Sequence, residues 1–495
     1  MPARGTEANG KRRENSGLSF RGRLMDGHAA SKTDVAGHPL ATGDVRRLLL
    51  KYAVPAIIAM VVGALYNMVD QIFIGWGVGM LGNAATNVAF PLMTFSMAIA
   101  LTLAIGGASN FNLEQGRGNR DRAGRIFANV LTYAAIFGTL IGAVALLLLD
   151  PMIAAFGATK EVFPYARAYM GIVVLGTPFL VMSVCSSHLI RADGSPRYSM
   201  MCNLTGALLN TVLDPLFIFT FKMGVAGAAW ATVISMMVNW CLAVFYMARL
   251  RTVELKPSYF KPRLNSLKAV SKLGIGAGFN QISMMFVQVT LNNVMTIYGA
   301  ASVYGSNIPL AASGIITKVN MLFMSVVIGI AQGGQPIISF NYGAKNYGRV
   351  RRAITFTLSS ATLVSAVVFL LFQAFPRQII DVFGKVNEQY YEFVERYFRI
   401  FLFMTCVNGI QPATANFFSS IGKAMRGFFI SLTRQILFLI PLMLIFASYG
   451  GIDGVMYAGP VADLAAAVLA AVYITREVRE MKRLENTAAR EYPGK

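Results

Sequence analysis

The sequence predicts an all-α polytopic membrane protein with about twelve transmembrane helices, arranged as two pseudo-symmetric lobes of six helices each. Three observations predict this fold class. Hydrophobic residues make up 55% of the 495 residues and charged residues only 14%, which is too apolar for a soluble protein of this length. Apolar runs of about 20 residues, enough to cross a hydrocarbon core of roughly 30 Å, recur along the chain. The two halves of the sequence also repeat one another.

The predicted spans begin near residues 50, 86, 125, 165, 198, 225, 270, 309, 352, 395, 428 and 455. Residues 1–45 precede them and are polar and basic, without the apolar segment of a signal peptide. We therefore expect a disordered cytoplasmic tail at 1–45. A six-helix lobe at 46–250, a cytoplasmic linker at 251–269, a second six-helix lobe at 270–476 and a cytoplasmic tail at 477–495 follow.

The internal repeat appears when the chain is compared with itself at an offset of about 227 residues. The matched pairs include Gly106 with Gly333, Gly116 with Gly343, Asn119 with Asn346, Arg122 with Arg349, Phe156 with Phe383, and Gly224 with Gly451. Six spans in each half return the chain to the side on which it began. The two lobes should therefore be related by a pseudo-two-fold axis along the membrane normal.

Basic residues are concentrated in every second loop, as in Arg120 to Arg125, Arg249 to Lys272 and Lys345 to Arg352. By the positive-inside rule, these loops and both termini face the cytoplasm of an inner-membrane protein. The net charge of +21 is then mainly a topology signal, with attraction to anionic membrane lipids. Nucleic-acid binding is the rival interpretation, and the even spread of charge between spans argues against it.

Two acidic residues, Asp70 and Asp214, lie inside predicted spans. A charged side chain in the membrane costs roughly 2.5 to 3.5 kcal/mol on insertion scales, so such residues usually pair, line a cavity or move an ion. The alternative is a structural hydrogen bond or helix cap. Both acids belong to the first lobe, and their repeat partners are Ile297 and Pro441. If an ion is carried, the first lobe should carry it.

Polar neighbours accompany both acids at helical spacing. Asn203, Asn210 and Asp214 fall within about 40° on one helix face, and Pro215 predicts a kink beside them. Tyr66 and Asn67 share the face of Asp70. These oxygen-bearing side chains suit H⁺ or Na⁺ and are poor ligands for soft metals. We therefore expect no metal centre other than a possible Na⁺ at Asp70 and Asp214.

The seventh span contains Gln281, Gln288 and Asn292, which either line a substrate cleft with Tyr66, Asn67 and Asn203 or form interhelical hydrogen bonds. Arg434 and Asp463, in the eleventh and twelfth spans, are candidates for an ion pair. No catalytic motif and no phosphate-binding loop for ATP is present. The sequence thus predicts neither an enzyme nor a cofactor.

Four stretches carry a family resemblance that covers roughly residues 45 to 480. They are Tyr66 to Gly75, Arg191 to Arg197, Leu209 to Ile218 and Gly224 to Thr232. On these residues the chain resembles the multidrug and toxic compound extrusion (MATE) family, most closely its bacterial MepA-like branch. The resemblance implies a twelve-helix antiporter that exports cationic, lipophilic compounds in exchange for H⁺ or Na⁺ by alternating access.

The resemblance also implies an ion-coupling site at Asp70, Asp214, Asn210 and Thr232. One departure is Ser187, which stands where some relatives have an asparagine in the ion site. The alternative function is a flippase for a lipid-linked or amphipathic precursor, which a cleft rich in basic side chains would favour. We expect small organic cations and membrane lipids as partners, and a monomer.

Overall fold

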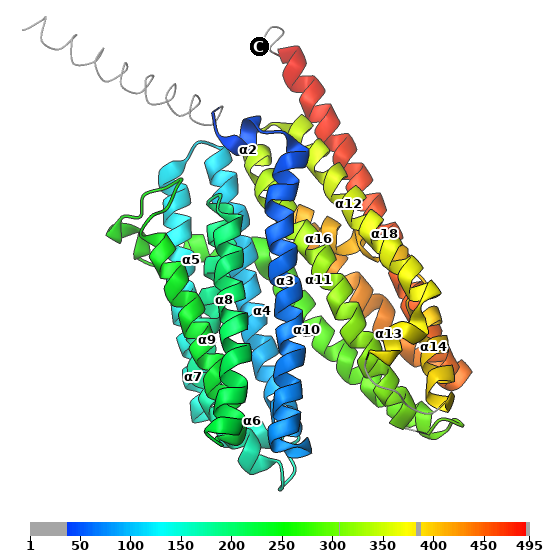
Figure 1. The fold of residues 1–495 in the computed structure, drawn as a ribbon. Coiled ribbons are helices and arrows are strands. Elements are labelled where there is room, and N and C mark those ends of the chain that lie inside the picture. The colour runs from blue at the N-terminus through cyan, green and yellow to red at the C-terminus, as the bar shows by residue number, and fades with distance from the viewer. Residues whose placement is uncertain (1–36, 306, 383–387, 492–495) are drawn as a thin grey trace, which may run out of the picture.

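A computed structural model describes residues 37–305, 307–382 and 388–491 of the chain, and every regular element in these ranges is a helix (Figure 1). The elements are α2 (Pro39–Thr42), α3 (Val45–Val78), α4 (Met80–Gly116), α5 (Arg120–Leu147), α6 (Leu149–Ala155), α7 (Phe163–Ala192), α8 (Pro196–Pro215), the π-helix η1 (Leu216–Thr220), α9 (Gly224–Met247), the 3₁₀-helix η2 (Pro257–Phe260), α10 (Leu264–Ala300), α11 (Asn307–Gly343), α12 (Tyr347–Ala374), α13 (Pro376–Asp381), α14 (Glu388–Phe401), α15 (Thr405–Asn408), α16 (Ile410–Ser420), α17 (Ala424–Leu432), the π-helix η3 (Thr433–Leu439) and α18 (Ile440–Glu491).

Nine of the described helices are long and apolar enough to cross a membrane. The long helix α10 is a further span, although its asparagine and glutamine side chains lower its mean hydropathy. A further span is broken into the short helices α14, α15 and α16. The run that ends in α18 contains two spans, because the backbone bends at Gly451. The total is the predicted twelve, and the chain is a multi-pass membrane protein.

The bend at Gly451 explains why one matched pair of the sequence repeat consists of glycines. Gly224 and Gly451 are repeat partners, and both have a positive φ, +57° and +59° respectively. Residues with a Cβ avoid this left-handed conformation, whereas glycine adopts it readily. Each lobe therefore uses a glycine at the same point, where the chain turns into its last span.

The two lobes lie side by side in Figure 1, with α3 to α9 (blue to green) on the left and α10 to α18 (green to red) on the right. Helix α4 of the first lobe packs along α10, and α3 packs along α11. We call the end that carries α2, the loops after α4, α7, α9, α11 and α16, and the C-terminal part of α18 the basic end. The lobes meet near the basic end and diverge toward the opposite end (Figure 1).

Reciprocal glycine contacts mark the pseudo-two-fold axis between α4 and α11. A Cβ added to Gly116 would lie 1.9 Å from the carbonyl oxygen of Phe340, and one added to Gly343 would lie 2.2 Å from that of Leu113. Leu113 and Phe340 are separated by the same offset of about 227 residues as the two glycines. The two contacts are therefore equivalent under the pseudo-two-fold rotation, and only glycine allows backbones to approach so closely.

Polar side chains also connect the lobes in the half nearer the basic end. Arg191 of α7 donates to Oε1 of Gln332 on α11 at 2.6 Å, and Gln335 of α11 donates to Oγ of Ser109 on α4 at 2.8 Å. Arg191 is only 3% exposed. These bonds hold the basic end closed in the structure.

Part of the predicted disordered tail is ordered on the second lobe, which corrects that prediction from residue 37 onward. The carbonyl oxygen of Leu40 accepts from Asn341 Nδ2 at 2.9 Å, and that of Gly43 accepts from Arg349 at 2.6 Å. The His38 ring stacks on Phe340 with a centroid distance of 4.5 Å. Residues 1–36 of that tail lie outside the described residues. The other predicted lobe, linker and tail limits remain predictions, although α10 already begins at Leu264, inside the predicted linker.

Candidate functional site

The structure brings Asp70 of α3 and Asp214 of α8 together. The two residues are 8% and 0% exposed, and their carboxyl groups lie close enough to interact electrostatically. A hydrogen bond between carboxyl groups forms only when one of them carries a proton, because two adjacent carboxylates repel each other strongly in a medium of low dielectric constant. The pair can therefore hold a proton or, between two charged carboxylates, a small cation.

No fixed positive charge compensates this pair within the described residues, where neither acid has a lysine, arginine or histidine in ion-pair contact. Oδ1 of Asp70 is fully buried and accepts no hydrogen bond from a donor in the described chain. Buried carboxylates normally have such partners, since an unpaired buried charge is costly.

The buried acid of the second lobe differs. Asp463 accepts from Nε of Arg434 at 2.6 Å and from Nδ2 of Asn408 at 3.1 Å. The predicted pairing of Arg434 with Asp463 is confirmed. Because a permanent cation neutralises Asp463, this acid has no need of a mobile ion.

Asn210 connects Asp214 to the neighbouring helix α9. One orientation of the Asn210 side-chain amide allows both its nitrogen and its oxygen to form hydrogen bonds. In this orientation Asn210 donates to Oδ2 of Asp214 at 3.1 Å and accepts from the backbone N–H of Thr232 at 3.3 Å. Asn210 is 2% exposed and Thr232 is 9% exposed. The four predicted ion-coupling residues therefore lie in one buried group formed by α3, α8 and α9.

Two further residues belong to this group, and neither was predicted from the sequence. Gln71 lies beside Asp70 and accepts from Oγ1 of Thr86 on α4 at 3.2 Å. Tyr169 of α7 is buried close to both carboxyl groups, and the half-buried Tyr66 also lies near them. Gln71 is rotated by about 100° from Asp70 on the helix, so spacing did not point to it. Tyr169 stands in an apolar span with no polar pattern that would have revealed it.

The backbone of α8 changes beside the acids. The α-helix ends at Pro215 and continues as the π-helix η1, in which Phe221 N–H donates to the carbonyl oxygen of Leu216 at 3.0 Å. This change of helix type lies directly after Pro215, where the sequence predicts a kink. Short π-helical segments are frequent at functional sites, and this one places a deformable turn next to Asp214.

Of the predicted cleft residues in the first lobe, the structure places only Tyr66 beside the acids. Asn67 is exposed and donates to the carbonyl oxygen of Gly63 in its own helix at 2.7 Å. Asn203 instead donates to Oγ of Ser187 at 2.8 Å and accepts from Asn239 at 3.3 Å. This polar cluster is separate from the acid pair. It contains Ser187, the position at which the sequence differs from the asparagine of some relatives.

The predicted cleft residues of the second lobe form their own group on α10. Gln288 donates to Oδ1 of Asn292 at 2.9 Å and accepts from Thr317 of α11 at 3.4 Å. Gln281 is half-buried on the same helix, nearer the basic end. The six residues therefore do not meet as one surface, and their role in substrate binding remains a prediction.

The donor set around the acids limits what the group can bind. It consists of carboxylate, amide and hydroxyl groups, which are ligands for H⁺ and hard cations such as Na⁺. No cluster of three or more histidine, cysteine, aspartate or glutamate residues that could hold a metal ion occurs in the described ranges. The chemistry available here is reversible ion binding.

Comparisons with known proteins match the fold described above. The family profile described as MatE matches residues 55–216 and 277–445, more than half of the chain and once in each lobe. Curated relatives include the "Multidrug export protein MepA" of Staphylococcus aureus (strain MRSA252), 24% identical over 440 residues, covering 88% of this chain and 94% of that protein. The protein of the same name from Staphylococcus haemolyticus (strain JCSC1435) is 22% identical over 425 residues, covering 86% and 92%.

Two solved structures show the same fold at 23% identity. One is the outward-facing conformation of a multidrug resistance MATE family transporter of the MOP superfamily, with a TM-score of 0.84, covering 90% of this chain and 99% of that chain. The other is a MOP superfamily transporter from Pyrococcus furiosus whose reversed binding-pocket polarity suggested a different function, with a TM-score of 0.83, covering 90% and 98%.

Proposed function

Since the chain belongs to the MatE family of membrane transporters, we propose that it is a secondary active multidrug exporter. It expels cationic, lipophilic compounds in exchange for H⁺ or Na⁺ by alternating access. The observation that carries this proposal is the buried pair of Asp70 and Asp214, which has no fixed cation in contact within the described chain. The names of the curated relatives, which are multidrug export proteins, support the substrate class.

The acid pair couples the ion to the drug through conformation. A proton or Na⁺ that enters from the end opposite the basic end neutralises the repulsion between the carboxyl groups and draws α3 and α8 together. The π-helix η1 is the part of α8 that can absorb this movement. Because an ion shifts the two states only through its different affinity for each, the ion and the drug bind competitively.

The proposed orientation follows from the loop charges. With the basic end in the cytoplasm, both termini are cytoplasmic, and the lobes are closed to the inside by Arg191 with Gln332 and by Gln335 with Ser109. The acid pair lies in the opposite half, toward the outside, where an inward ion gradient delivers its ion. The protein acts in the inner membrane as a monomer.

Transport of ethidium by purified protein in proteoliposomes tests the proposal. An imposed H⁺ gradient and then an imposed Na⁺ gradient should reveal which ion drives the dye. Asp214→Asn should reduce driven transport at least tenfold, because removing one of the two negative charges weakens cation binding at the site. The matched control is Asp150→Asn, which removes an exposed carboxylate that pairs with Arg167 at 2.8 Å, and it should transport normally.

Two results would contradict the proposal. Undiminished gradient-driven transport by folded Asp214→Asn would refute the role of the acid pair. Absence of ethidium transport under both gradients by folded wild-type protein would refute the multidrug exporter and favour the flippase for an amphipathic precursor.

A further inference from the structure

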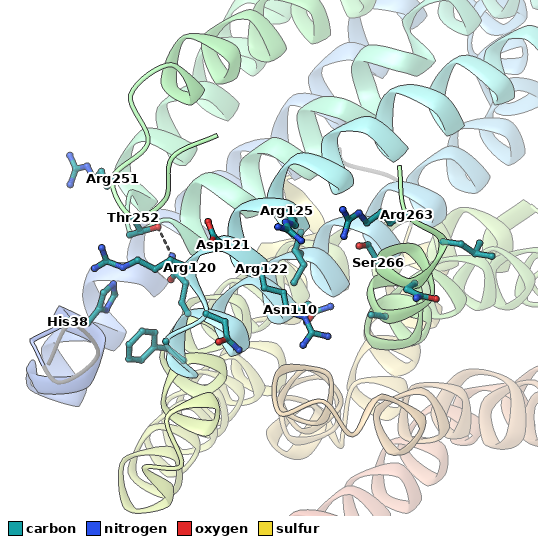
Figure 2. A pocket seen from close by; sticks show the side chains of 18 residues that line it. His38, Asn110, Arg120, Asp121, Arg122, Arg125, Arg251, Thr252, Arg263 and Ser266 are labelled. Carbon is teal, nitrogen blue, oxygen red and sulfur yellow. Dashed lines mark hydrogen bonds between the residues drawn. The ribbon is translucent and has the colours of Figure 1, made fainter. Parts of the chain in front are cut away.

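A basic cavity of about 1130 Å³ lies at the basic end, far from the acid pair. Figure 2 shows the side chains that line it, which come from α2, α4, α5, the segment before α10, α10 and α11. Its size is slightly above the usual range of roughly 300–1,000 Å³ for small-molecule sites. The transport mechanism proposed above makes no use of it.

The cavity is strongly positive. Among the described residues, five arginines line it and Asp121 is its single acidic residue. The Asp121 carboxylate is already engaged, because it accepts from the Tyr259 hydroxyl at 2.5 Å and pairs with Lys256 at 3.6 Å. The arginines of the lining are Arg120, Arg122, Arg125, Arg251 and Arg263. These arginines therefore give the cavity a net positive charge.

Three of these arginines surround the same part of the cavity. In Figure 2 the side chains of Arg122, Arg125 and Arg263 extend toward the space between α5 and the first turn of α10, where Ser266 lies, whereas Arg251 points away. Arg122 is 3.8 Å from Glu114, but Glu114 already accepts from Arg117 at 2.6 Å. Guanidinium groups arranged around one space match the geometry of phosphate oxygens.

Two helix N-termini add to this positive potential. Residues of the first turns of α5 and α10 line the cavity, and neither helix has a side-chain hydrogen bond at its N-cap, Asn119 or Arg263. The first N–H groups of a helix and its dipole favour an anion. Gln115 is 7% exposed, lines the cavity and has an Oε1 atom that accepts no hydrogen bond from the described residues. This acceptor suits a hydroxyl group of a ligand.

We propose that this cavity binds a phosphate ester, the chemistry shared by the headgroup of an anionic phospholipid and by soluble phosphate compounds. Phosphate oxygens would contact Arg122, Arg125 and Arg263. The lining includes α5 of the first lobe together with α10 and Phe340 of the second, so a bound anion bridges the lobes. Occupancy would favour the conformation in which the basic end is closed.

Thermal unfolding of the full-length protein in detergent tests this inference, with native mass spectrometry to count bound lipid. The probes are dioleoylphosphatidylglycerol, zwitterionic dioleoylphosphatidylcholine and inorganic pyrophosphate, all at equal ionic strength. A ligand that binds only the folded protein raises its Tm. The double variant R122Q/R263Q should bind the active probe at least tenfold more weakly, since each basic residue near an anionic headgroup contributes several-fold.

The matched control is R479Q/R483Q, which removes two exposed arginines of α18 at the same end. It should respond like the wild type. A Tm rise with phosphatidylglycerol alone identifies a lipid site, and a rise with pyrophosphate alone identifies a soluble ligand. No rise with either anion, or an equal response from both double variants, overturns the proposal. The single variant Arg263→Gln replaces the double variant if the latter unfolds without ligand.

Discussion

At the scale of single residues, the buried carboxylates of the two lobes differ in their partners. Asp463 has Arg434 at 2.6 Å, whereas Asp70 and Asp214 have each other and the neutral side chains of Gln71 and Asn210. A permanently paired acid contributes to folding. In the proposed mechanism, an acid pair without a fixed cation is stabilised only when an ion is bound, and this couples ion binding to a change of state.

The two kinds of acid should respond oppositely to the same substitution. Asp463→Asn leaves the Arg434 guanidinium, whose side chain is 11% exposed, without its counter-charge, and should destabilise the protein by about 3 kcal/mol. Asp214→Asn removes a repulsive charge and should leave the Tm unchanged or higher. Thermal unfolding of both variants in the same detergent measures the difference. A drop in Tm for Asp214→Asn as large as that for Asp463→Asn would show that Asp214 is structural.

At the scale of elements, the docking of the short helix α2 depends on the protonation of one histidine. His38 caps α2, because its Nδ1 accepts from the N–H of Leu40 at 3.2 Å, and it stacks on Phe340 of the second lobe. Burial, together with the positive charge of Arg120, lowers the pKa of His38 below its ordinary value of 6.5. The docked helix thus favours neutral histidine.

Docking of α2 should therefore weaken in acid. With the docked pKa below the undocked value of 6.5, the stabilisation is fully present above pH 6.5 and is lost as the pH falls toward the lowered pKa. Hydrogen–deuterium exchange of residues 38–43, corrected for the intrinsic rate, should accelerate by up to about tenfold per pH unit below 6.5. His38→Asn keeps a capping side chain that does not titrate, and its corrected exchange should be independent of pH. A pH dependence that persists in this variant would assign the effect to another group.

At the scale of the whole molecule, backbone contacts between the lobes define the conformation. Besides the reciprocal pair at Gly116 and Gly343, a Cβ on Gly274 of α10 would lie 1.8 Å from the carbonyl oxygen of Thr102 on α4. These contacts all lie in the half nearer the basic end. Rocking of the lobes must break them, so the glycines determine how tightly this end closes.

Gly116→Ala should open the basic end. The new methyl group would meet the backbone of Phe340, which cannot move aside as a flexible side chain can, at a cost of about 1 to 3 kcal/mol to the closed state. The distance between spin labels at Arg197 and Met425, in protein lacking Cys241 and Cys406, should shift toward longer values. Gly314→Ala adds the same methyl group where nothing lies within 4 Å and should leave the distance distribution unchanged. A wild-type distribution in Gly116→Ala would show that these contacts do not limit closure.

Much of this protein could be predicted from the sequence because membrane solvation acts on local stretches of chain. Apolar runs and the repeat predicted twelve helices in two lobes, Pro215 predicted a kink where α8 changes to a π-helix, and the buried charges Asp70, Asp214, Arg434 and Asp463 were recognisable because charge in hydrocarbon is costly. The tertiary structure decided which polar residues meet. Helical spacing put Asn203 on the face of Asp214, yet packing against α7 and α9 directs it to Ser187 and Asn239.

The sequence by itself thus determined the class of fold, the duplication and the acids, since each depends on local composition or on comparison of the chain with itself. Only the tertiary structure decided that Asp70 and Asp214 share one site with Gln71 and Tyr169, that α2 docks on the second lobe, and that arginines of α5 and of the segment before α10 enclose one cavity. The physical reason is that these groups lie on different helices. Their contacts depend on how helices rotate and cross in the packed protein, which spacing along one helix does not specify.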